Sequence, residues 1–296
     1  MTYSSNAGLA TYCIMCLSIL SLWVKHPLRI ANASIKIWVI LFAIVLFIFT
    51  MGGLVQISGF LFCLSLLLAS YLSTNMNINS KIRIFSFFML LALCLSLSFN
   101  LISGFSKVAI SNNIFIGSSK EPIVFSIYFG KFAMIVFLTA IAYNKLSHPQ
   151  EIPRLLLYSL AFGGAWIPLV LFVGYLLGAQ FEFKIHSSLL LYASMNLFFT
   201  CILEEVFFRG LIQNKMKEYL ATFTVHHHSI AIGITSLLFG VAHLSGGTKM
   251  IIAATIAGIG YGIIYDRTQK IECAIFLHFL LNVSTFITMV YPISFK

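Results

Sequence analysis

Charged side chains are scarce in this chain, and acidic ones are the scarcest. Of the 296 residues, 8 are Asp or Glu, 18 are Lys or Arg, and 9% are charged in all. A soluble domain carries about 25% charged residues, so this chain lacks the polar groups needed to cover a water-facing surface. With 60% hydrophobic residues and a mean hydropathy of +0.99, it is instead predicted to lie in a membrane.

The long apolar runs predict an all-α fold, a polytopic transmembrane helical bundle of about ten spans, within a range of eight to ten. About 20 apolar residues cross a bilayer as a helix. Residues 1–150 are expected to form N-terminal transmembrane helices of unassigned role, and residues 151–296 a second membrane domain. The expected spans lie near residues 8–24, 36–55, 57–74, 84–102, 123–144, 154–178, 187–213, 228–244, 250–265 and 272–291.

The excess of positive charge fits a membrane orientation better than a nucleic-acid partner. The net charge is +10, and the basic residues fall in short gaps between apolar runs. Twelve of the 18 Lys and Arg lie in one set of alternate gaps and five in the other. Because cytoplasmic loops are enriched in Lys and Arg, both termini are predicted to lie outside the cytoplasm. The lipid bilayer is therefore an expected partner, and nucleic acid is not.

Three polar stretches interrupt the apolar pattern of the second half: EEVFFR at 204–209, FGVAH at 239–243 and HFLLN at 278–282. A charged side chain at the bilayer centre costs roughly 2.5–3.5 kcal/mol, so such residues face a protein interior or a wet cavity. They are either functional or members of a hydrogen-bonded cluster that holds helices together.

Helical spacing separates the two adjacent glutamates. Glu205 and Arg209 are four residues apart, so they share a face and are predicted to form an ion pair. Glu204 points about 100° away and has no local partner. A carboxyl group in apolar surroundings can act as a base or an acid near neutral pH. His278 and Asn282, also four apart, are expected to face one cavity.

A Glu, two His and an Asn in a membrane cavity fit the hydrolysis of a peptide bond. Glu204 would take a proton from a water that His243 helps to position, and His278 and Asn282 would donate hydrogen bonds to the oxyanion. This set has no Ser or Cys beside a His and no paired aspartates, which disfavours a serine or aspartyl mechanism.

Two alternatives stay open. Glu204, His243 and His278 have the His₂Glu composition of catalytic zinc sites. The H-E-x-x-H pattern is absent, however, so a glutamate-activated water without a cofactor is favoured over a zinc-dependent protease. A proton-coupled transporter would also place Glu and His at membrane depth. Transporters usually show matching interruptions in two halves, whereas here the polar residues lie in one half.

The three stretches EEVFFRG, FGVAH and HFLLN resemble, in order, the motifs E-E-x-x-x-R, F-x-x-x-H and H-x-x-x-N/D of the CPBP family. Its members include the type II CAAX prenyl endopeptidases and the bacterial Abi-type membrane proteases. The resemblance covers about residues 187–291 and makes residues 151–296 the expected catalytic domain. It implies an intramembrane endopeptidase that acts on a protein or peptide at the membrane, lipidated or not.

The resemblance also implies a role for each motif residue. Glu204 is expected to be the activating carboxylate with His243 as its partner, while His278 and Asn282 hold the oxyanion. The expected location is the bacterial inner membrane, with a site reached from the cytoplasmic side. The supporting motif residues are Glu205, Arg209 and Phe239.

Overall fold

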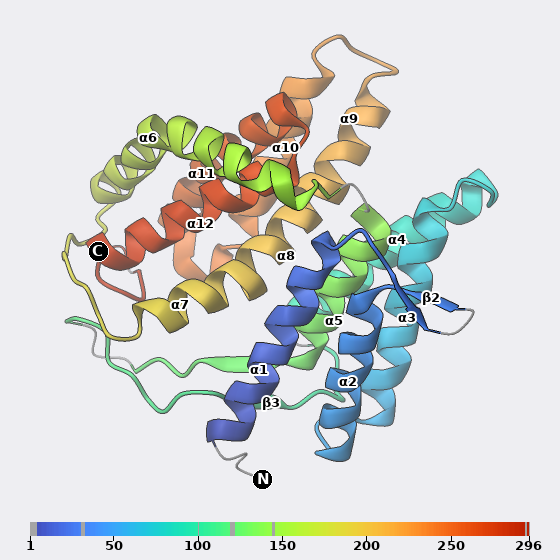
Figure 1. Ribbon diagram of the computed structural model, residues 1–296. Helices are drawn as coiled ribbons and strands as arrows, with labels where there is room; N and C mark the ends of the chain where they lie inside the picture. The colour runs from blue at the N-terminus through green and yellow to red at the C-terminus, as the bar shows by residue number, and fades with distance from the viewer. Residues whose placement is uncertain are drawn as a thin grey trace. The chain divides into compact units, whose positions relative to one another are not determined.

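The computed structural model describes residues 5–30, 33–99, 101–118, 122–143, 146–293 and 295. Their secondary structure is mostly helical, with two short antiparallel hairpins (Figure 1). A backbone in lipid must satisfy its hydrogen bonds within its own segment, which favours helices. The predicted all-α class is confirmed. The chain divides into two compact units, one of Met1–Asn112 with Val124–Pro149 and one of Asn113–Ile123 with Gln150–Lys296.

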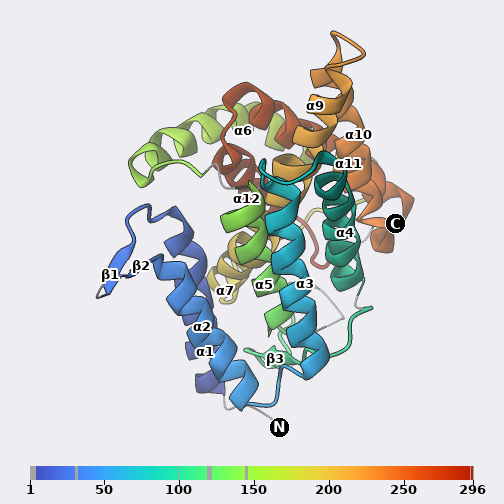
Figure 2. The same cartoon turned by 90° about the vertical axis from the view of Figure 1, so that its right-hand side faces the viewer.

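In the first unit, α3 packs along α4, and α1 packs along α2 (Figure 2). Its core is aromatic: Phe49, Phe129 and Phe132 are almost fully buried, and the Phe49 and Phe129 rings lie 5.2 Å apart. The described helices of this unit are α1 (Ser5–Leu20), α2 (Ile37–Met51), α3 (Ile57–Thr74), α4 (Ser80–Ser98) and α5 (Phe129–Phe137). The hairpins are β1 (Leu28–Ile30) with β2 (Ala33–Ile35), and β3 (Lys107–Ala109) with β4 (Ser126–Tyr128).

In the second unit, α10 packs along α11, and α12 packs against both α6 and α11. The short helices α7, α8 and α9 belong to one helical run, Leu189–Leu220. The helices described here are α6 (Ile152–Leu176), α7 (Leu189–Asn196), α8 (Ile202–Glu205), α9 (Asn214–Leu220), α10 (His227–Val241), α11 (Gly247–Thr268) and α12 (Ile271–Thr288).

Six helices in the described residues are long and apolar enough to cross a membrane, which supports an integral, multi-pass membrane protein. Four other apolar helices have fewer than 18 residues, so the predicted count of about ten spans is not confirmed. The six are Ile57–Thr74, Ser80–Ser98, Pro149–Leu176, Leu189–Leu220, Leu244–Thr268 and Ile271–Thr288. The shorter ones are Ala7–Trp23, Ile37–Met51, Phe129–Ile141 and His227–Val241.

Local backbone geometry shortens two of the predicted spans. Helix α2 ends at Met51, before the expected residue 55, because the chain turns at Gly52 and Gly53, the latter with a φ of +67°. Residues 126–128 pair with β3 as a strand, so α5 begins at Phe129 rather than near residue 123. Hydropathy does not detect either feature, because the residues involved do not interrupt the apolar run.

Helices α10 and α11 approach each other closely at glycines. A Cβ atom on Gly240 of α10 would collide with Thr255 Oγ1 and lie 2.7 Å from the backbone oxygen of Ile251, both on α11. On α11, a Cβ at Gly258 would lie 3.3 Å from the Cα of Ser236 on α10. Small residues of this kind let membrane helices pack backbone to backbone. Residues 258–262 therefore form a helix contact.

Alanine substitutions at two glycines of α10 should have opposite effects on stability. Gly240→Ala is expected to lower it by about 1–3 kcal/mol, because the added methyl overpacks the α10–α11 contact. Gly233→Ala is the matched control, since a Cβ there meets nothing within 4 Å; it should raise stability by up to about 1 kcal/mol through helix propensity. Thermal unfolding of the purified protein in detergent measures both. Equal shifts for the two variants would contradict the close packing.

Candidate active site

The first motif lies on a helical run whose geometry is irregular. Two π-helical segments, Leu197–Cys201 and Val206–Gln213, flank the single turn of α8 that carries Glu204 and Glu205. A π-helical segment widens the helix and is frequent at functional sites. The run has 32 residues, or about 48 Å at 1.5 Å per residue, which exceeds a hydrocarbon core of about 30 Å.

Glu205, Arg209 and His278 form a buried network. Arg209 Nε donates to Glu205 Oε2 at 3.0 Å, and both side chains are fully buried. His278 of α12 contacts the other oxygen, with Nδ1 2.8 Å from Glu205 Oε1. Because a carboxylate only accepts hydrogen bonds, this contact places a proton on Nδ1 of His278. The predicted Glu205–Arg209 pair is present within one helical run, and the contact between Glu205 and His278 ties α8 to α12.

Glu204 differs from its neighbour in exposure and in bonding. Its side chain is 27% exposed, whereas that of Glu205 is fully buried. Its Oε2 atom is buried and has no hydrogen-bond partner among the described residues. The nearest imidazole nitrogen is Nε2 of His278, which lies 4.0 Å from Glu204 Oε2, beyond hydrogen-bond reach. Glu204 thus combines a partly exposed side chain with one buried carboxylate oxygen that has no hydrogen-bond partner among the described residues.

Aromatic rings enclose the network from α10 and α11. The ring of Tyr261 stacks on the imidazole of His278 at 4.6 Å and 16°, and Phe239 meets that imidazole edge-on at 5.7 Å. The Arg209 guanidinium lies 5.3 Å from the Phe239 ring and 5.9 Å from the Tyr261 ring. Its two terminal nitrogens have no hydrogen-bond partner in the described part of the chain, so cation–π contacts stabilise that charge.

His243 lies just past the end of α10, at Val241, rather than inside the predicted span 228–244. Its Nδ1 is 2.8 Å from the backbone oxygen of Phe239, a carbonyl that the helix end leaves open, and its ring lies 4.8 Å from the Phe239 ring. Within the described residues, no hydrogen bond or ion pair joins His243 to Glu204. Phe239 connects His243 to the network.

Asn282 lies one turn beyond His278 on α12 and contacts an amide that the motifs do not include. Its Nδ2 donates to Asn196 Oδ1 at 3.3 Å, and Cys201 Sγ donates to the same oxygen at 3.0 Å. Asn196 is an uncharged amide two turns before Glu204 in an apolar run, a weak signal in the sequence. Tyr261 gave no signal of its contact with His278, because a tyrosine beside glycines first indicates helix packing.

The structure therefore joins most of the predicted residues, although not as one ring of ligands. Glu204, Glu205, Arg209 and His278 lie together, and Phe239 covers them and contacts His243. Asn282 lies one turn from His278 and bonds to Asn196 instead. Among the described residues there is no group of three His, Cys, Asp or Glu that could hold a metal ion.

Breaking the buried pair should destabilise the protein far more than breaking an exposed one on the same helical run. Arg209→Ala leaves Glu205 buried without its cation, at an expected cost of about 3–5 kcal/mol. Lys215→Ala is the control, because its 2.8 Å pair with Glu218 has side chains that are 50% and 61% exposed; its expected effect is below about 1 kcal/mol. The readout is the midpoint of thermal unfolding in detergent, and similar midpoints for the two variants would refute the network's structural role.

The family model described as "Type II CAAX prenyl endopeptidase Rce1-like" matches residues 186–284, a segment that contains all three motifs. No curated protein and no solved structure matches the chain. The match rests on the same part of the chain as the Glu205 network and includes Asn196, Cys201 and Tyr261. The predicted resemblance to the CPBP family is thereby confirmed: residues 186–284 are similar to the Rce1-like type II CAAX prenyl endopeptidases.

Proposed function

We propose that this protein is an intramembrane endopeptidase that hydrolyses a peptide bond of a membrane-associated protein or peptide, with or without a lipid anchor. The observation that carries the proposal is the free carboxylate oxygen of Glu204, 4.0 Å from an imidazole whose other nitrogen contacts Glu205. The similarity of residues 186–284 to CAAX endopeptidases supports the reaction class. We also propose that the site is reached from the cytoplasmic side of a bacterial inner membrane; the Lys and Arg asymmetry between the gaps of the ten predicted spans bears on the orientation alone.

In this proposal, Glu204 is the general base. It accepts a proton from a water molecule, whose oxygen attacks the carbonyl carbon of the scissile bond. Glu204 then delivers that proton to the leaving nitrogen as the carbon–nitrogen bond breaks. The partial exposure of its side chain allows water to reach it, while its buried oxygen lacks a competing partner. His243, at the end of α10, positions the water or the substrate.

His278 and Asn282 stabilise the oxyanion. Nε2 of His278 is the ring nitrogen that faces Glu204, and it donates only when both ring nitrogens carry a proton, since Nδ1 already donates to Glu205. The amide nitrogen of Asn282 donates to Asn196 Oδ1 at 3.3 Å and lies 4.0 Å from Cys201 Sγ, a weak acceptor that the oxyanion would replace. Donors fixed in advance are the effective kind, because they need not reorient as charge develops.

A glutamate-activated water is favoured over zinc by the separation of the candidate ligands, not by the contacts of the imidazoles. Nδ1 of His278 contacts Glu205 and Nδ1 of His243 contacts the carbonyl of Phe239, which leaves Nε2 of both rings open to a ligand. Within the described residues, however, no three His, Cys, Asp or Glu side chains lie close enough to share a metal ion. The three candidate ligands would need to move together before they could bind one ion. The proposal therefore uses no cofactor.

Replacing Glu204 with Gln keeps the shape of the side chain and removes the base. We expect kcat on a membrane-inserted reporter peptide to fall by about 10²–10⁴-fold. The melting temperature should stay close to that of the parent, because the free oxygen makes no hydrogen bond that would be lost. Glu218→Gln, on the exposed face of α9, is the matched control. A Glu204→Gln protein that cleaves at the parental rate would remove the assignment, and uptake without proteolysis would favour a transporter.

Asn196 is expected to act as a positioning residue for Asn282. Asn196→Leu, of similar size, removes the acceptor that holds the Asn282 amide, so kcat should fall by roughly tenfold while KM stays within about twofold. The check is a double-mutant cycle with Asn282→Ala, in which Asn196→Leu should slow cleavage no further. An equal slowing in both backgrounds would mean that Asn196 acts through the fold alone.

A further inference from the structure

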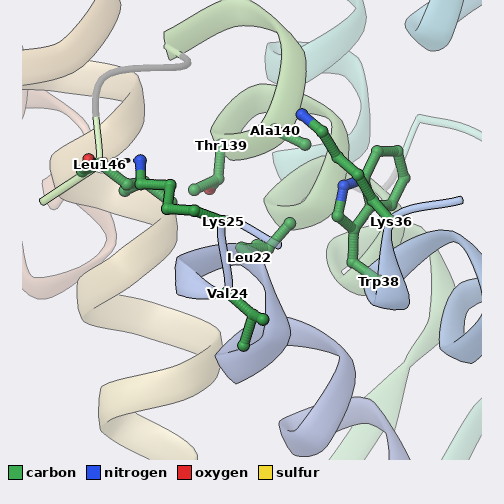
Figure 3. A pocket seen from close by; sticks show the side chains of 8 residues that line it. All are labelled: Leu22, Val24, Lys25, Lys36, Trp38, Thr139, Ala140 and Leu146. Atoms are coloured by element: carbon green, nitrogen blue, oxygen red, sulfur yellow. Dashed lines mark hydrogen bonds between the residues drawn. The ribbon is translucent and has the colours of Figure 1, made fainter. Parts of the chain in front are cut away.

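The first unit contains a small polar cavity remote in sequence from the three motifs. Its volume, counted as the space open to the centres of water-sized spheres, is about 60 Å³. One water needs about 10–15 Å³ on that measure, so a group of several atoms fits. The walls come from the end of the α1 segment, the start of α2 and the π-helical continuation of α5, Leu138–Tyr143 (Figure 3).

Hydrogen-bond donors line this cavity. Thr139 Oγ1 is fully buried and has no hydrogen-bond partner among the residues described, although a helical threonine commonly bonds the carbonyl one turn back. Figure 3 shows Thr139 with Lys25 and Lys36 to either side of it. Lys25 Nζ donates to the backbone oxygen of Leu146 at 2.7 Å and retains two further protons.

The surrounding unit has no carboxylate side chain to neutralise these lysines. Across Met1–Asn112 and Val124–Pro149 the sequence has eight Lys and Arg and no Asp or Glu. Lys25 and Lys36 are exposed and the Thr139 hydroxyl is buried, so none of these three donors meets a carboxylate of its own unit. An anion with several oxygens satisfies all three donors at once.

The surroundings of the cavity indicate where that anion comes from. Trp38 forms part of its wall, and tryptophan is enriched where a membrane meets water. Val24, Leu28 and Val39 nearby in the sequence are 41%, 45% and 40% exposed, so apolar surface continues from the charged opening. Basic pockets at the ends of membrane helices bind lipid head groups. We propose that Lys25, Lys36 and Thr139 bind the phosphate of an anionic membrane lipid.

The test is a lipid titration of the whole 296-residue chain in neutral detergent. The melting temperature of the protein is measured at each lipid concentration. Phosphatidylglycerol should stabilise the parent, and phosphatidylcholine should do so much less. Lys25→Gln with Lys36→Gln should raise the phosphatidylglycerol concentration that gives half of the maximal stabilisation roughly thirtyfold. Each lysine contributes about 1 kcal/mol, which is a factor of about five to six. The control pair Lys81→Gln with Arg83→Gln removes the same charge at the start of α4 and should leave it unchanged.

Thr139→Val keeps the shape of the side chain, removes the buried hydroxyl and alters no charge. It should weaken the phosphatidylglycerol response several-fold even where the lysine pair fails to fold. The site would be overturned if the control pair Lys81→Gln with Arg83→Gln weakened the phosphatidylglycerol response as much as the cavity pair does. It would also be overturned if neither Thr139→Val nor Lys25→Gln with Lys36→Gln weakened that response. Inorganic phosphate is the second probe. If it stabilises the parent protein at millimolar concentration and Thr139→Val weakens that effect too, the cavity binds phosphate and the proposal of a lipid ligand is wrong. The titration measures no cleavage, so its outcome is independent of the protease proposal.

Discussion

The buried contact between Glu205, Arg209 and His278 is the constraint on which the candidate site depends. It places a carboxylate, a guanidinium and an imidazole where no water screens them, and each satisfies part of the others' bonding capacity. Removing one member leaves a buried charge without compensation, which is far more costly than the pair is favourable. Because its members come from α8, the following π-helical segment and α12, the network also fixes how these elements meet.

The network explains why two adjacent glutamates have different environments. Successive residues on a helix diverge by about 100°, so only one of the pair can face Arg209. Glu205 uses both oxygens in the network, while Glu204 is turned toward a partly exposed surface and keeps one oxygen free. The structural demand for a buried carboxylate and the chemical demand for an available one are thus met by neighbouring residues. Exchange of the two roles would require a different helix rotation.

Local spacing predicted the contacts within one helix, and it missed those between helices. The Glu205–Arg209 pair follows from a four-residue separation, and a cavity that holds both Glu204 and His278 was expected from the cost of polar groups in lipid. The bond from His278 to Glu205 was not expected. The stacking of Tyr261 on His278 and the Asn282–Asn196 bond join residues far apart in the chain, so no periodicity encodes them. His243 was expected inside a span, yet α10 ends at Val241. The expectation failed because hydropathy does not detect a helix end within an apolar run.

The two units differ in how the charges of their basic side chains are compensated. All eight acidic residues belong to the second unit, where five different carboxylates pair with a Lys or Arg. The first unit has eight basic residues and no acidic one, so most of the net charge of +10 belongs to it. A basic surface beside apolar helices is attracted to anionic lipid head groups. The second unit can therefore stabilise its polar site internally, whereas the charge of the first unit is complemented by the membrane itself.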